Sequence, residues 1–431
     1  MKGKLKYFSV IWLGAMLMAL LPAISAFAEN GEPDDIAVGI ADMSIPSESA
    51  TAGEGLTASL ITCAPGPEVY ELFGHEAIRI KGIDRNGLPL DSVWNYGVFD
   101  FASPNFIYRF VKGETDYMLY GCPFSWFISS YVERGSGVTE QELNFTQEET
   151  ERLRKLLQIN ALPAHRTYRY SYIRDNCSTR VAQVVEEAVK PRRVIWPDTV
   201  NYGSFRKAMR DMHRDYPWYQ FGIDLALGSG IDRRISSQEE LFAPLLMEEK
   251  AAGARFGDGA PLVKSTEMIY PGAHYMTTGE MGNTLPPTPW WLSPRFAAYL
   301  VLMISIAVAW MTWRGGLHGI LLRGWYSLYF GVSGLAGCLL WFLVFVSSHD
   351  ATSPNLLALW LNPLQLVIAV CVWWRGGRPA AIAMAAVNVL VLAVLSLWWP
   401  WQSQSANDAI FPLWLATAAL CGGLCGARSR Q

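Results

Sequence analysis

Cys177 and His75 are the two residues whose types and settings could support covalent acyl chemistry. Cys177 lies in the segment DNCST (175–179), where an aromatic, strand-like run gives way to a helical one. A thiol in the first turn of a helix faces unpaired backbone N–H groups and the positive end of the helix dipole, both of which favour thiolate. We therefore expect Cys177 to be a nucleophile. The alternative is a small buried hydrophobic residue whose thiol is not used.

His75 begins an alternating, strand-like segment, FGHEAIRI (73–80), and could take the proton from the thiol. A third group must hold the imidazole in the correct tautomer. Asn95, on the next predicted strand, is the first candidate for this role, and Asp100 is the second. Asn176 either supplies an oxyanion donor beside the backbone N–H of Cys177 or caps the helix.

The N-terminus has the pattern of an export signal. Lys2, Lys4 and Lys6 precede an apolar run (8–21), and AFA (26–28) fits a cleavage site, so residues 1–28 are predicted to be a signal peptide. An uncleaved membrane anchor is the alternative. Residues 29–54 are acidic and rich in Ser, Ala, Gly and Pro, which predicts a linker without a packed core.

The last third of the chain predicts a membrane domain over residues 291–431. Five apolar runs have about the length that a transmembrane helix needs: 296–313, 326–346, 356–374, 380–398 and 409–425. Two connections carry arginine, namely Arg314 with Arg323 and Arg375 with Arg378, and Arg428 with Arg430 follow the fifth run. The other two connections, near 349–350 and 402–408, carry no Lys or Arg. The positive-inside rule then places the C-terminus in the cytoplasm and residues 55–290 outside it.

Composition narrows the classes of function. Hydrophobic residues make up 51% of the chain and charged residues 17%, below the roughly 25% of an average soluble domain. The apolar runs contain almost no ionisable side chain, which argues for an anchor or lipid-facing platform over a pump. A net charge of −3 does not indicate nucleic-acid binding. The sequence has neither a zinc-type Cys or His spacing nor a phosphate-binding glycine loop, so we expect no metal and no cofactor.

Seven cysteines do not form the pattern of a disulfide framework, because four of them fall in the apolar runs. The exported part keeps Cys63, Cys122 and Cys177. An oxidising exterior could pair Cys63 with Cys122 and leave Cys177 free, or all three could be thiols.

Residues 55–290 predict one α+β domain. We expect strands at 58–62, 75–80, 92–96 and 166–173, and helices at 146–157 and 177–189. The first helix begins with a capping box, Thr146 with Glu149. The histidine precedes the cysteine in the chain, the reverse of the usual papain-like order. This arrangement resembles the circularly permuted NlpC-type (papain-like) cysteine enzymes.

A closer resemblance covers nearly the whole chain. Its motifs are LITCAPG (60–66), FGH (73–75), WNYGVFDF (94–101) and DNCSTR (175–180). They are similar to those of the lipoprotein N-acyltransferase family of Bacteroides-type bacteria, a periplasmic domain followed by a membrane bundle. The resemblance implies an acyltransferase of the cytoplasmic (inner) membrane with its catalytic domain in the periplasm. It would move a fatty acyl group from a phospholipid or lipoprotein donor to the α-amine of the N-terminal diacylglyceryl cysteine of exported lipoproteins.

Two rival functions remain open at the level of sequence. NlpC-type domains outside the cytoplasm are more often peptidoglycan amidases or endopeptidases, although a wall hydrolase needs at most one membrane anchor. The other rival is a non-catalytic, membrane-tethered scaffold.

Overall fold

The computed structural model describes residues 55–66, 71–84, 87–100, 103–273, 276, 288–398, 404 and 407–428. The predicted signal peptide (1–28) and acidic linker (29–54) lie outside these ranges. The described chain divides into two compact units. The sheet unit comprises residues 55–208 and those from Arg234 onward to 276, and the membrane unit comprises Met209–Arg233 with the residues from 288 onward. The structure therefore divides the predicted 55–290 domain, because Met209–Arg233 packs with the membrane helices.

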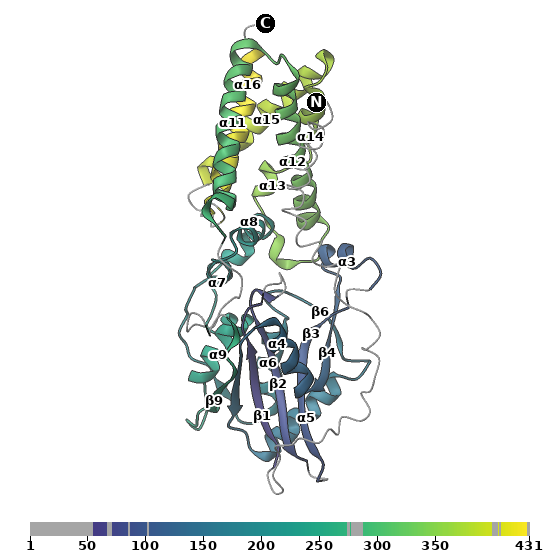
Figure 1. Ribbon diagram of the computed structural model, residues 1–431, viewed down its shortest axis with the longest axis vertical. Coiled ribbons are helices and arrows are strands. Elements are labelled where there is room, and N and C mark those ends of the chain that lie inside the picture. Colours follow the sequence, from purple (N-terminus) through teal and green to yellow (C-terminus); the bar gives the residue numbers. More distant parts are fainter. Residues whose placement is uncertain are drawn as a thin grey trace. The chain divides into compact units, whose positions relative to one another are not determined.

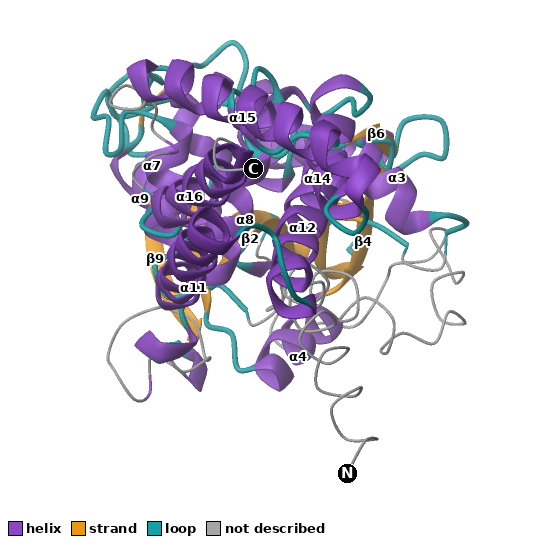
Figure 2. Cartoon of the chain, turned by 90° about the horizontal axis from the view of Figure 1, so that it is seen from above, coloured by secondary structure: helices purple, strands orange, loops and turns teal. Residues whose placement is uncertain are grey.

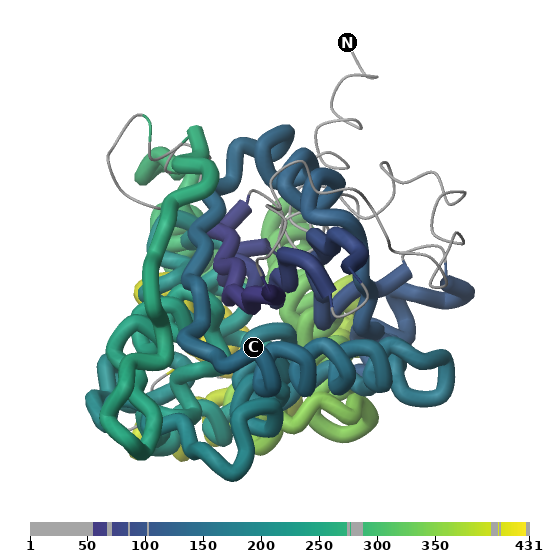
Figure 3. The backbone as a smooth tube through the Cα atoms, turned by 90° about the horizontal axis from the view of Figure 1, so that it is seen from below, coloured from purple at the N-terminus to yellow at the C-terminus, as the bar shows by residue number. Residues whose placement is uncertain are grey.

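The sheet unit is built on a seven-stranded antiparallel sheet in the order β6-β4-β3-β2-β1-β5-β9. Its strands are β1 (Thr57–Cys63), β2 (His75–Ile83), β3 (Pro89–Val98), β4 (Asp116–Pro123), β5 (Val138–Leu143), β6 (Thr167–Arg169) and β9 (Val263–Tyr270). Figure 3 shows the green tube of β9 beside that of β5, with the purple β1 next to it. Three of the four predicted strands are confirmed. The fourth, at 166–173, is strand only over Thr167–Arg169, after which Ser171 and Asp175 close a turn.

Helices cover both faces of this sheet. One face carries Leu60, Ile78 and Ile80 and packs against α5 (Gln147–Asn160), α6 (Cys177–Ala188) and α9 (Pro244–Gly253). The opposite face carries Ile61 and Ala77 and packs against α4 (Phe124–Arg134). Both predicted helices are present, and α5 begins with the expected capping box. The smaller elements are α3 (Phe106–Lys112), α7 (Phe205–Met212), which ends in the membrane unit, and the paired strands β7 (Val194–Ile195) and β8 (Arg255–Phe256).

The membrane unit has, within the described residues, four helices long and apolar enough to cross a bilayer. They are α11 (Pro294–Gly315), α12 (Ile320–Phe345), α15 (Arg378–Trp398) and α16 (Ile410–Arg428). Helices α11 and α16 run side by side in both views (Figures 1 and 2). The third of the five predicted runs is not one continuous helix. It forms α13 (Leu357–Trp360) and α14 (Gln365–Cys371), separated by a break at 361–364.

The break occurs at Pro363, which has no N–H to donate and disfavours helical geometry in the preceding residue. Carbonyl groups freed in a membrane must find donors within the protein. Asn362 Nδ2 donates to the carbonyls of Leu359 (2.9 Å) and Trp360 (3.2 Å), and Gln365 Nε2 also donates to Trp360. These two polar side chains of the third apolar run therefore satisfy its interrupted backbone.

Polar contacts join Met209–Arg233 to two connections of the membrane bundle. Within α8 (Pro217–Ala226), the buried Asp224 carboxylate accepts from Arg210 (3.1 Å) and from Asn407 Nδ2 (2.9 Å). Gln404 Nε2 donates to the Asp224 carbonyl (3.1 Å), and Asn355 Nδ2 donates to the Leu225 carbonyl (2.8 Å). These hydrogen bonds thus hold Met209–Arg233 to both of the connections that carry no Lys or Arg.

Candidate active site

Cys177 is the first residue of α6, as the sequence predicts. Asn176 is the N-cap: its Oδ1 accepts from the Thr179 backbone N–H (2.9 Å), within a capping box. Its Nδ2 donates to the carbonyls of Tyr172 (3.0 Å) and Phe242 (2.8 Å). Because both amide hydrogens are used in this way, the hydrogen bonds of Asn176 are those of a helix cap, not of an oxyanion donor.

Near Cys177 the regular pairing of strands β2, β3 and β4 ends, which leaves an opening in the sheet. Strands β2 and β3 pair as far as Ala77 and Asn95, and the register of β3 against β4 then shifts between Asn95 and Val98. At this opening the backbone N–H of Glu76 is close enough to the Cys177 sulfur to act on the pKa of the thiol, which it lowers. Gly97 lies there with φ 93°, and a Cβ on it would be 3.8 Å from the Cys177 Cβ. The thiol therefore sits beside the peptide that joins His75 to Glu76.

His75 is oriented by Asn95. His75 Nε2 lies 3.1 Å from Asn95 Oδ1, while Asn95 Nδ2 points to Cys122 Sγ at 3.9 Å. With the amide in this orientation, Nε2–H is the donor to Asn95, and Nδ1 is left as the basic nitrogen. Asp100, the second candidate, is instead exposed and accepts from Ser103 Oγ (3.1 Å).

The structure thus brings His75 and Asn95 into contact and places Cys177 at the neighbouring peptide. Among the described residues, no hydrogen bond joins the Cys177 thiol to the His75 ring.

Burial sets the charge of both reactive groups. It raises the pKa of Cys177 to about 11, although the backbone N–H groups of Glu76 and Ser178 act in the opposite direction. Burial also lowers the pKa of His75 to about 4, against the effect of the Asn95 hydrogen bond. The expectation that the helix terminus favours thiolate is therefore overturned, because desolvation outweighs the N–H groups. The resting pair is a neutral thiol and a neutral imidazole.

Glu76 is a further buried group at the site, and the sequence alone did not indicate a role for it. Thr62 Oγ1 donates to Glu76 Oε2 (2.9 Å), and Oε1 has no partner within the described part of the chain. Burial raises the pKa of the Glu76 carboxyl well above its usual range, while the hydrogen bond from Thr62 acts in the opposite direction. Its alternation with Ile78 and Ile80, both core residues, was the signal that could have revealed its burial.

Cys63 and Cys122 are free thiols. They lie on β1 and β4, with β2 and β3 between them. Three strand spacings of about 4.8 Å each separate these strands, far more than the Cα separation of about 7 Å that a disulfide allows. The alternative of a Cys63–Cys122 disulfide is therefore wrong.

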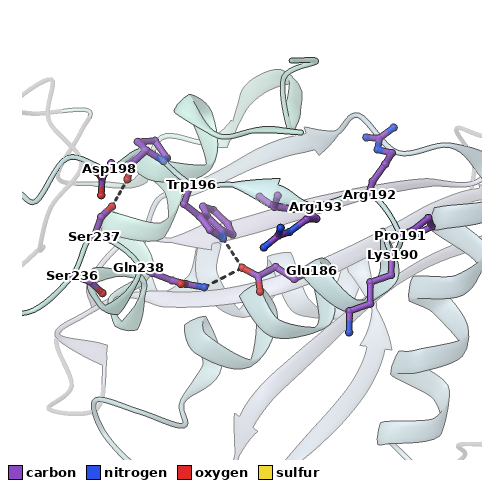
Figure 4. Close-up of a pocket in the computed structure, with 12 residues that line it drawn as sticks. Glu186, Lys190, Pro191, Arg192, Arg193, Trp196, Asp198, Ser236, Ser237 and Gln238 are labelled. Carbon is purple, nitrogen blue, oxygen red and sulfur yellow. Dashed lines mark hydrogen bonds between the residues drawn. The ribbon is translucent and has the colours of Figure 1, made fainter. Parts of the chain in front are cut away.

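A cavity of about 880 Å³ lies at the other end of α6 (Figure 4). Glu186 projects from the helix and accepts from Trp196 Nε1 (2.6 Å) and Gln238 Nε2 (3.4 Å). Two of the basic residues that line it are already paired, Lys190 with Glu187 and Arg192 with Glu149. Nine residues of helix, about 13 Å, separate Glu186 from Cys177, so this cavity is not part of the thiol site.

Fold and site together define a membrane protein whose α+β domain carries a cysteine at a helix start and a histidine held by an asparagine. The Lnb N-terminal periplasmic domain matches residues 48–205, and the Lnb transmembrane domain matches residues 287–422. The chain therefore belongs to the Lnb-type lipoprotein N-acyltransferase family, as its motifs indicated. Comparison with curated proteins and with solved structures gave no significant match. The relation to a circularly permuted papain-like fold stays a prediction.

Proposed function

We propose that this protein is a lipoprotein N-acyltransferase that works through a thioester on Cys177. The acyl donor is a phospholipid or the glyceryl ester of a lipoprotein, and the acceptor is the α-amine of an N-terminal diacylglyceryl cysteine. The observation that carries the proposal is the His75–Asn95 pair at the peptide beside the Cys177 sulfur, in a chain of the Lnb family.

In the first half-reaction, the Cys177 sulfur attacks the ester carbonyl while His75 Nδ1 takes the thiol proton. The carbon–oxygen bond of the donor then breaks, and the departing alkoxide takes that proton from the imidazolium. Asn95 supports this sequence because its Oδ1 holds Nε2–H and so leaves Nδ1 as the basic nitrogen. A neutral resting pair suits this role, since the base is unprotonated at neutral pH.

In the second half-reaction, the lipoprotein amine attacks the thioester and loses a proton to His75. The carbon–sulfur bond breaks, and the sulfur recovers the proton as a thiol. An acyltransferase must let an amine compete with water, so a buried site is favourable. Cys177 is only 8% exposed.

The membrane unit supports a site that acts on lipids. We propose that the protein resides in the cytoplasmic membrane, with the C-terminus in the cytoplasm. The described membrane helices offer no chain of ionisable side chains, and this favours an anchoring or lipid-facing role.

The proposal is tested with a diacyl lipid that carries a labelled acyl chain. Without an acceptor, label should accumulate on the full-length protein as a hydroxylamine-sensitive thioester, and a diacylglyceryl-cysteine peptide should then discharge it. Cys177→Ala, Cys177→Ser and His75→Ala should abolish labelling. Cys63→Ala, which removes another buried thiol of the same domain, should retain it.

Three results would contradict the proposal. Cleavage of muropeptides without lipid label on Cys177 would favour a wall hydrolase. Absence of both labelling and hydrolysis would favour a scaffold. Normal transfer by Cys177→Ala would exclude this nucleophile.

A further inference from the structure

The Tyr168 hydroxyl is an unused donor in the core of the sheet unit. Tyr168, on β6, is 8% exposed, and its hydroxyl has no hydrogen-bond partner among the residues that the structure describes. Folded proteins rarely leave a buried hydroxyl unpaired, because it loses its hydrogen bonds to water without replacement. Such an exception calls for a function.

The hydroxyl lies beside the candidate nucleophile. The place that a Gly97 Cβ would take is 3.9 Å from the Tyr168 hydroxyl and 3.8 Å from the Cys177 Cβ. The two groups therefore flank one small space, which is open because residue 97 is a glycine. Gly97 has φ 93°, a conformation that other residues rarely adopt.

Residues of the cysteine motif hold the Tyr168 ring in place. The Arg180 guanidinium stacks on this ring, with its central carbon 3.5 Å from the ring centroid. Asp175 accepts from Arg180 Nε (2.5 Å) and Nη2 (2.8 Å), which fixes the plane of the guanidinium. Burial raises the pKa of Tyr168, so the hydroxyl keeps its proton, while the Arg180 charge acts in the opposite direction.

We propose that the Tyr168 hydroxyl and the backbone N–H of Cys177 form the oxyanion hole of this site. When the sulfur bonds to an acyl carbon, the carbonyl electron pair moves to oxygen, and this oxygen accepts hydrogen bonds from both donors. No proton leaves Tyr168. When the leaving group departs, the carbonyl re-forms and the hydroxyl is again unpaired. The same donors serve attack on the ester and attack on the thioester. The inference rests on the proposed function of Cys177.

Tyr168→Phe tests the inference because it removes only the hydroxyl oxygen. We expect both the rate of thioester formation and the rate of its discharge to fall by about 100- to 1000-fold, the usual effect of losing one oxyanion donor. The melting temperature should not fall, since the hydroxyl makes no hydrogen bond to any residue that the structure describes. The rate of Cys177 alkylation by iodoacetamide should also be unchanged, because displacement of iodide creates no oxyanion.

Tyr96→Phe is the matched control. Tyr96 is a buried tyrosine of the same core, and its hydroxyl accepts from Asn160 Nδ2 (2.9 Å). This variant should keep its acylation rate and lose a few degrees in melting temperature, the reverse of the pattern for Tyr168→Phe.

A fatty aldehyde, such as hexadecanal, separates failure of this inference from failure of the proposed function. The Cys177 sulfur adds to the aldehyde carbon and the thiol proton goes to its oxygen, which then occupies the oxyanion position. Tyr168→Phe should weaken this reversible adduct at least 10-fold. An unchanged affinity, or an unchanged rate of thioester formation, would reject the role of Tyr168. Adduct formation that depends on Tyr168, together with no acylation by lipid, would support the hole and reject the acyltransferase.

Discussion

At the scale of single residues, burial decides the protonation of the candidate catalytic pair. The backbone N–H groups of Glu76, Ser178 and Cys177 itself lower the pKa of the Cys177 thiol, yet this pKa rises to about 11 because the thiol is removed from water. The same burial lowers the pKa of His75 to about 4. In the proposed mechanism, thiolate therefore forms only as the sulfur attacks, with His75 as general base.

The neutral pair predicts a particular pH dependence of thiol alkylation. Between pH 6 and about 10 the thiolate fraction of Cys177 should rise about tenfold per pH unit, because the pH stays below the raised pKa of the thiol. The rate of iodoacetamide incorporation at Cys177, measured by mass spectrometry, should follow this rise. A preformed thiolate–imidazolium pair would instead give a rate that is constant between about pH 5 and 8.

The types of the candidate catalytic residues were easier to predict from the sequence than their protonation states. Cys177, His75 and Asn95 could be selected from motif and order, because each chemical role restricts the residue type. The charge of the pair depends on how deeply tertiary packing buries it, which a sequence does not contain. Tyr168 belonged to a recognisable strand-like run, but only the structure shows that its hydroxyl has no partner within the described ranges of the chain.

At the scale of elements, the third apolar run of the membrane unit is interrupted by a break at 361–364. Helix α12 comes very close to it: a Cβ on Gly337 would lie 2.6–2.7 Å from backbone atoms of Asn362. Hydropathy identified the apolar run 356–374, but not that the run is two short helices. Pro363 was the available signal, and Asn362 and Gln365 beside it bind the freed carbonyl of Trp360.

Gly337→Ala should therefore destabilise the membrane unit. The added methyl group meets backbone, which cannot rotate away, so we expect a loss of about 3 kcal/mol, the upper end of the usual cost of overpacking. Thermal unfolding of the detergent-purified protein measures this effect. Gly331→Ala on the same helix is the control, since its Cβ would meet only the Ala369 Cβ at 4.0 Å. Equal stability of the two variants would contradict the close packing of α12 against the break.

At the scale of the whole molecule, contacts within the membrane unit define two ends of the bundle. At one end, Arg323 donates to the Trp373 carbonyl (3.4 Å) and Arg378 to the Leu317 carbonyl (3.1 Å). At the other, Asn355 bonds to α8 and Arg295 pairs with Asp408. The chain from Asn355 to Trp373 thus connects both ends, although its two helices are short.

This arrangement predicts the topology in the membrane. Reporter fusions after Arg323, Arg378 and Gln431 should be active in the cytoplasm, and fusions near Asp350 and Gln404 should be active outside it, because arginine marks only the first set. A fusion after Gln431 that reports the exterior would contradict five passes.

Asp224 and Asn407 are 183 positions apart in the chain, so during synthesis Asp224 is made well before the residue that donates a hydrogen bond to it. At about 5–20 residues per second, the ribosome needs on the order of 10–40 s to add the missing partner after Asp224 has emerged. In the same interval the chain must also deliver β9 to the edge of a sheet whose other strands were made earlier. Neither unit is contiguous in sequence: the sheet unit is interrupted by Met209–Arg233, and the membrane unit stays unfinished until the residues from 288 onward have been made. During that interval the Asp224 carboxylate can pair with Arg210 but not yet with Asn407. Met209–Arg233 is then incompletely bonded and is exposed to chaperones and proteases.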